Sequence, residues 1–155
     1  CSRDWSSDVC SSDLPQTDRV ASMPGRLDTG EFAIDLQMPT GAHLASNGPG
    51  VTIEAEPGFS LQVQRWPDRD LGNLRRLLQQ RLGDRWLRLQ SLDSDAVIVQ
   101  ARPAPDGSGG GYHLEALVDD GDVFYRCRSR PSGSFVLAEV ERMLATCRTI
   151  VTARP

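Results

Sequence analysis

Two cysteines in the C-terminal third of the chain are the residues whose placement most directly suggests chemistry. Cys127 alternates with the apolar residues Val123 and Tyr125 on a predicted strand, and Cys147 lies on the apolar face of the last predicted helix. Both side chains are therefore expected to point inward, which would bring this strand and this helix together. A disulfide between them would close a loop of about twenty residues and add roughly 3 kcal/mol of stability. The alternative is a pair of buried free thiols, since unpaired cysteine is often buried.

Three arginines alternate on the other face of the same predicted strand. Arg126, Arg128 and Arg130 would follow one another at intervals of about 6.8 Å. Guanidinium groups bind carboxylates and phosphates through planar pairs of hydrogen bonds. The three residues could therefore form a strip that holds an anion or a partner protein. The competing interpretation, which we favour, is a solvated sheet face that nearby Asp and Glu partly neutralise.

No catalytic residue, metal ligand or cofactor-binding motif is predicted. His113 is expected on the sheet face opposite the core, and the sequence places no Ser or Asp to form a triad with it. A hydrolase that uses His113 is therefore the least favoured hypothesis. His43 is isolated in a loop-like stretch. The glycine-rich residues 107–111 lack the Lys-Ser/Thr ending of a phosphate loop and precede a strand pattern, so a hairpin loop is expected there.

Hydrophobic periodicity predicts the elements that carry these residues. Strands are predicted where apolar and polar residues alternate, and helices where apolar residues recur every three or four positions. The predicted order is three strands, a helix, four strands and a helix, at residues 32–37, 51–55, 59–66, 70–83, 87–89, 96–101, 112–118, 123–127 and 134–151. The first three strands are expected to form an antiparallel meander. The predicted class is α+β, with two helices packed on a mostly antiparallel sheet of about six to seven strands.

This order of elements resembles the PsbP-like α/β/α sandwich domains, a group that includes many small bacterial envelope proteins and lipoproteins. The resemblance extends over residues 31–152. It rests on the opening phrase at 32–39, the strand 59–63 that leads into a helix, and the terminal phrase at 140–150. The resemblance implies a sandwich fold and carries no function, and no functional residue of the group can be transferred to a position here.

The first fourteen residues are not expected to belong to the natural protein. Residues 4–14 resemble one reading frame of a common sequencing adapter, show no apolar period and consist mainly of Ser and Asp. We expect residues 1–14 to be an artefact without order, 15–30 to be a linker, and 31–155 to form a single α+β domain. Cys1 followed by Ser2 is typical of a mature lipoprotein, but its position beside the adapter-like segment removes most of that evidence.

Composition excludes several functional classes. Leaving out Arg3 and the three Asp residues of the adapter-like segment changes the formal net charge from −4 to −2. This near-neutral balance does not predict binding to nucleic acid or to a membrane surface. No apolar run approaches the roughly eighteen residues that a membrane span requires. All basic residues are Arg, which indicates a GC-rich bacterial genome.

These features predict a non-enzymatic domain of the bacterial periplasm or cell envelope. Its expected role is to bind a protein partner, whose identity the sequence does not give, or to stabilise an assembly. The predicted disulfide is the main argument for the location, because disulfides persist in oxidising compartments. The alternative is a cytoplasmic accessory protein or chaperone of a secretion system, which reduced cysteines would favour. No cofactor is predicted.

Overall fold

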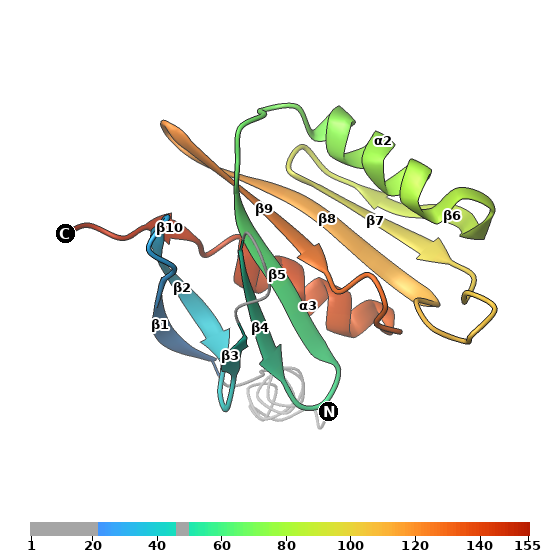
Figure 1. Ribbon diagram of the computed structural model, residues 1–155, viewed down its shortest axis with the longest axis horizontal. Helices are drawn as coiled ribbons and strands as arrows, with labels where there is room; N and C mark the ends of the chain where they lie inside the picture. The colour runs from blue at the N-terminus through green and yellow to red at the C-terminus, as the bar shows by residue number, and fades with distance from the viewer. Residues whose placement is uncertain (1–21, 46–49) are drawn as a thin grey trace, which may run out of the picture.

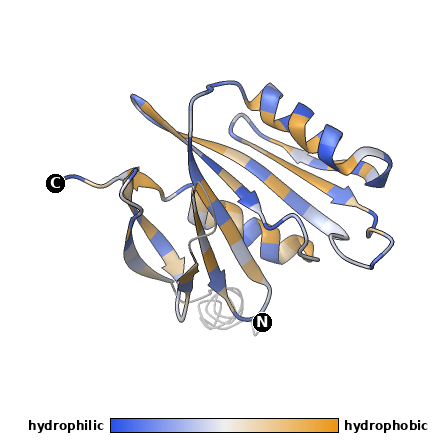
Figure 2. Cartoon of the chain, in the orientation of Figure 1, coloured by the Kyte–Doolittle hydropathy of each residue, from blue (hydrophilic) through white to orange (hydrophobic). Residues whose placement is uncertain are grey.

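The main sheet of the protein has seven antiparallel strands, in the order β3-β4-β5-β9-β8-β7-β6 (Figure 1). A computed structural model describes residues 22–45 and 50–155. Along the sheet, apolar and polar residues alternate within most strands, as Figure 2 shows. The strands are β3 (His43–Ala45), β4 (Val51–Ala55), β5 (Phe59–Trp66), β6 (Trp86–Leu92), β7 (Ala96–Ala101), β8 (Gly111–Asp120) and β9 (Val123–Ser129).

Helix α2 (Leu71–Leu82) lies on one face of this sheet. Asp70 caps its first turn by accepting a hydrogen bond from the backbone N–H of Gly72 at 2.8 Å. Its buried residues are four positions apart, which places them on one stripe of the helix. These residues, Leu74, Leu78 and Leu82, pack on β7, β8 and β9. A short 3-10 turn, η1 (Gly83–Arg85), connects α2 to β6.

Helix α3 (Leu137–Cys147) lies on the opposite face. Within β7, Val97 and Val99 pack beneath α2, whereas Ala96 and Ile98 belong to the cluster that contains α3. Because successive strand residues point to opposite faces, the two helices cover opposite sides of the sheet. The helix begins after Val136, whose N–H donates to the Glu139 carboxylate at 2.9 Å. It does not begin at residue 134, where the predicted helix starts.

A second sheet of three strands packs beside α3, in the order β1-β2-β10. It consists of β1 (Ser22–Asp28), β2 (Ala33–Pro39) and β10 (Val151–Thr152). Leu27 of β1 and Ile34 and Leu36 of β2 are buried, and the two β2 residues lie in the same core cluster as α3. This sheet was not expected from the sequence.

Two expectations therefore change at the N-terminal end. The strand at 33–39 pairs with β1 and β10. Of the three strands that were predicted to form a meander, only β4 and β5 therefore pair with each other. Residues 22–28, which were expected to be part of a linker, form β1; Leu27 is its one buried residue, so no apolar alternation marked it as a strand. The expectation for residues 1–14 lies outside the described residues.

The α+β class is confirmed: two helices pack on a seven-stranded antiparallel sheet, beside a small three-stranded one. In the described part of the chain, neither helix has the length and apolar character needed to cross a membrane.

Candidate anion-binding site

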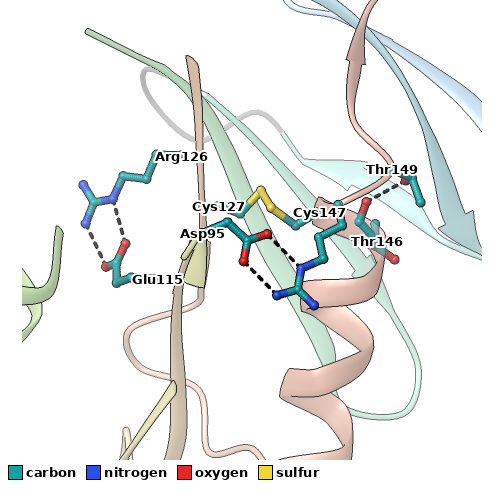
Figure 3. Close-up of a disulfide and its surroundings, with 8 residues drawn as sticks. Asp95, Glu115, Arg126, Cys127, Thr146, Cys147 and Thr149 are labelled. Atoms are coloured by element: carbon teal, nitrogen blue, oxygen red, sulfur yellow. Dashed lines mark hydrogen bonds and ion pairs between the residues drawn. A yellow bond between two sulfur atoms is a disulfide. The ribbon is translucent and has the colours of Figure 1, made fainter. Parts of the chain in front are cut away.

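The two cysteines form a disulfide in the core beneath α3. Cys127 of β9 and Cys147 at the end of α3 are fully buried, their Cα atoms are 6.2 Å apart, and they are separated by 20 positions in sequence. The predicted pairing is confirmed, for the predicted reason that both residues lie on inward faces. The bond ties the central strand β9 to the last helix (Figure 3).

A buried ion pair lies on the other side of the same strand, as Figure 3 shows. Glu115 of β8 has no exposed surface and accepts two hydrogen bonds from Arg126 of β9. The Arg126 Nε donates to Oε2 and its Nη2 donates to Oε1, each at 2.8 Å. The guanidinium also lies 4.7 Å from the centre of the Trp66 ring, in cation–π contact. Geometry of this kind is what a charge pair requires in order to be stable away from water.

Helix α2 brings a second guanidinium to the same carboxylate. The Nη1 of Arg81 lies 3.6 Å from the Glu115 Oε1, which is an ion-pair distance but too long for a hydrogen bond. Both Nη atoms of Arg81 are buried and have no hydrogen-bond partner in the described part of the chain. Burial lowers the pKa of Arg81; the Glu115 charge opposes this shift, and Arg128 and Arg126 add to it.

Arg128 of β9 is the third cation of this region. Its Nε donates to the Gln62 Oε1 of β5 at 2.7 Å, so its hydrogen-bond partner is a neutral amide. Burial lowers the pKa of Arg128, and the neighbouring Arg126 charge lowers it further, while Glu115 opposes both. We refer to Arg81, Arg126 and Arg128 with Glu115 as the arginine cluster. In it, three guanidinium groups face a single carboxylate.

The predicted strip of three arginines is therefore divided. Arg126 and Arg128 belong to the cluster, whereas Arg130 is exposed and forms an ion pair with Glu54 at 3.4 Å. The Glu54 carboxylate also lies 3.3 Å from His43. The favoured interpretation of a neutralised, solvated face describes Arg130. It does not describe Arg126, because α2 covers that part of the sheet.

His113 lies on the α2 face, as the alternation predicted, but it is fully buried there. Its Nε2 is 2.6 Å from the carbonyl oxygen of Gly109, which also accepts a hydrogen bond from the Arg85 Nη2 at 2.6 Å. Burial lowers the pKa of His113, and the Gly109 hydrogen bond only partly opposes this shift. Nδ1 has no hydrogen-bond partner among the described residues. The arrangement fits a neutral ring that donates from Nε2.

Gly109 is required for this contact by its surroundings. Its φ is +67°, and a Cβ there would lie 2.4 Å from the Arg85 Nη2 and 2.9 Å from the Pro131 carbonyl oxygen. Only glycine allows the loop to approach Arg85 and Pro131 this closely. The loop at 107–111 thus positions a carbonyl for His113.

A hollow of about 500 Å³ lies beside Trp66. It is lined by Arg65, Trp66, Arg69 and Phe124, among others. Trp66 lines the hollow and also contacts the arginine cluster, because Arg126 stacks on its ring. Arg69 lies 4.7 Å from the centre of the Phe124 ring. The hollow is lined by two arginines and two aromatic rings, and the carboxylate of Asp122 also borders it.

Sequence reasoning missed Arg81. It lies three residues after Leu78 and seven after Leu74, so it borders the buried stripe of α2. Its position at the edge of this buried stripe was the sequence feature that could have identified Arg81. Within the described ranges, no group of three or more His, Cys, Asp or Glu side chains could hold a metal ion.

The chain matches no protein-family model, no curated protein and no solved structure. The resemblance to PsbP-like domains stays a prediction.

Proposed function

We propose that this chain is a non-enzymatic, protein-binding domain of the bacterial periplasm or cell envelope, and that the arginine cluster holds a carboxylate of its partner. One observation carries the proposal: both Nη atoms of Arg81 are buried without a hydrogen-bond partner, beside a carboxylate that Arg126 already occupies. A buried donor without a partner costs about 1 to 3 kcal/mol. An incoming anion would remove that cost.

The charge balance supports the same ligand chemistry. Arg81, Arg126 and Arg128 carry three positive charges against the one negative charge of Glu115, and burial lowers the pKa values of Arg81 and Arg128. Such shifts mean that the charged forms of these two side chains lack full compensation. A carboxylate between Arg81 and Arg128 would supply it through charge-assisted hydrogen bonds.

A protein segment suits this surface better than a free ion. Leu77 is 39% exposed and lies one turn before Arg81, on the same side of α2. The neighbouring sheet offers the Gln62 and Trp66 side chains, both half-buried. An acidic residue flanked by apolar residues would pair with Arg81 and cover Leu77 at the same time.

The disulfide supports the proposed location. Disulfides form and persist in oxidising compartments, whereas cytosolic thiols are kept reduced. The Cys127–Cys147 bond therefore favours the envelope over the cytoplasmic alternative. A hydrolase based on His113 receives no support from the geometry, because its ring is buried and its Nε2 hydrogen-bonds a backbone carbonyl.

Calorimetric titration with an oligoglutamate peptide tests the proposal, with an oligoglutamine peptide of equal length as the neutral probe. We expect only oligoglutamate to bind, with an affinity that falls as salt is added. Arg81→Gln should weaken binding by about tenfold or more, equivalent to about 1.4 kcal/mol.

The matched control is Arg76→Gln, which removes the same charge from an exposed position of the same helix. It should leave the affinity within about twofold of the original value, because salt screens exposed charges. Equal binding of both peptides, or equal losses in the two variants, would refute the proposal.

A further inference from the structure

Strand β6 is an outer strand of the seven-stranded sheet, and among the described residues it pairs only with β7 (Figure 1). Its outer edge therefore presents backbone N–H and C=O groups with no strand beside them. Leu87, Leu89 and Leu92 of this strand are 42%, 37% and 50% exposed. They are three of the eight large apolar side chains that the described chain exposes.

Two of these leucines lie on the same face as α2. Leu89 pairs with Val99 and Leu92 pairs with Val97, and both valines pack beneath α2. A bulge between Leu89 and Ser91 explains how residues three positions apart share a face. Arg88 pairs with Gln100, on the opposite face.

We infer that β6 pairs antiparallel with β6 of a second copy of this chain, about a two-fold axis perpendicular to the sheet. Such an axis places the α2 faces of both copies on the same side, so leucines can meet leucines. In the register that sets Leu89 opposite Leu92 of the partner subunit, two such leucine pairs form.

Charge complementarity selects the same register. It sets Arg88 opposite Asp93 of the partner subunit, and the symmetry repeats this pair at the other end. Arg148 binds Asp93 through Oδ2 at 2.9 Å, so Oδ1 can accept a hydrogen bond from the second copy. Gln90 and Ser91 would form the uncharged centre. No like charges face each other in this arrangement.

The opposite edge of the sheet lacks these properties. Strand β3 has three residues, and its His43 lies 3.3 Å from the Glu54 carboxylate of the neighbouring strand β4. Its one exposed leucine is Leu44, at 48%. The seven-residue edge of β6 offers leucine pairs and Arg88–Asp93 pairs across the proposed axis. It is therefore the better surface for binding a second copy.

Sedimentation velocity over a series of protein concentrations tests the inference. The sample is the full chain carrying Cys1→Ser and Cys10→Ser, so that these thiols cannot cross-link two copies. We expect a dimer whose dissociation constant rises by at least about tenfold in Leu89→Lys and stays unchanged in Leu44→Lys. Far-ultraviolet circular dichroism of each variant shows that the fold is retained.

A charge exchange makes the test specific for the register. Arg88→Asp alone and Asp93→Arg alone should each be monomeric, because like charges would then meet across the axis. An equimolar mixture of the two variants should dimerise again, since both contacts become complementary. A monomeric unmutated chain at millimolar concentration, equal effects of Leu89→Lys and Leu44→Lys, or a mixture that stays monomeric would each overturn the inference. Dimerisation is independent of anion binding, so either proposal can fail alone.

Discussion

The two faces of the central sheet are built on different principles. The face beneath α3 is apolar, continuous with the small sheet and cross-linked by Cys127–Cys147. The face beneath α2 holds two smaller apolar clusters together with the buried Glu115, Arg126 and His113. The same strands form both faces, because the side chains of successive residues in β9 point alternately to one face and to the other. The α3 side of this sheet is held by apolar packing and a covalent cross-link, whereas the α2 side buries charged and polar groups, some of which lack hydrogen-bond partners among the described residues.

The largest effect is expected from removing the only carboxylate of the arginine cluster. Glu115→Gln leaves the Arg126 charge buried without its ion partner, which costs about 3 to 5 kcal/mol of unfolding free energy. Urea unfolding followed by circular dichroism measures this loss. Added phosphate should recover part of it, because an anion can replace the missing charge.

Glu54→Gln is the matched control for that loss. Glu54 also contacts an arginine, but at 3.4 Å and with 29% of its side chain exposed. Exposed pairs contribute between about 0 and 1 kcal/mol. If the two substitutions destabilise the protein equally, the α2 face holds no special charge cluster and the contrast between the faces disappears.

The second effect concerns the α3 face. Replacing both Cys127 and Cys147 by alanine removes the constraint on the unfolded chain and should lower the unfolding free energy by about 3 kcal/mol. Anion binding at the α2 face should survive, because Arg126 and Arg128 keep their partners Glu115 and Gln62. A variant that unfolds at the same urea concentration as the original protein would contradict this account of the α3 face.

The third effect is a pH dependence that belongs to the α2 face. Burial holds the pKa of His113 below its ordinary value of 6.5. As the pH drops, this histidine is therefore protonated in the unfolded chain while it is still neutral in the folded protein. The free energy of unfolding consequently decreases below about pH 6.5, by at most about 1.4 kcal/mol per pH unit. His113→Leu should flatten this slope between neutral and mildly acidic pH in urea titrations. His43→Gln, which removes the other histidine from an exposed position, serves as the control; an equal change of slope in both variants would argue against His113 as its source.

The smallest stability effect is expected at Arg81, the residue on which the proposed anion binding depends most. Arg81→Gln removes a cation whose buried Nη atoms have no hydrogen-bond partner among the described residues and lie 3.6 Å or more from the Glu115 carboxylate, so the unfolding free energy should change by less than about 1 kcal/mol, or rise. Thermal and urea unfolding of this variant and of Arg76→Gln give the comparison. A loss as large as that of Glu115→Gln would mean that Arg81 is a structural part of the ion pair.

Local patterns of the sequence predicted much of the fold. Apolar patterns identified β2, β4, β5, β7, β8, β9 and the middle of β6, and spacing identified both helices. The inward positions of Cys127 and Cys147 were enough to place α3 against β9. The strands that were missed are short or carry Pro and Gly: β1, β3 and β10.

The candidate site was only partly predictable, because it is assembled from distant segments. The two-residue turn at Gly121 and Asp122 fixes the β8–β9 register, which brings Glu115 beside Arg126 and Arg128. That much could be worked out from the hairpin. The contact of Arg81 with Glu115 joins residues of α2 and β8, and no local pattern reports how a helix is placed across a sheet. The same placement of α2 buries His113.

The central claim is that the arginine cluster binds an anion, and side-chain NMR of the arginine Nε–H groups during an oligoglutamate titration tests it most directly. We expect the signals of Arg81, Arg126 and Arg128 to shift along one saturating curve with a common dissociation constant. The exposed Arg130 and Arg148, which are engaged by Glu54 and by Asp93 and Asp95, should stay in place. Equal, non-saturating shifts of all arginines, or shifts confined to Arg130 and Arg148, would contradict the account.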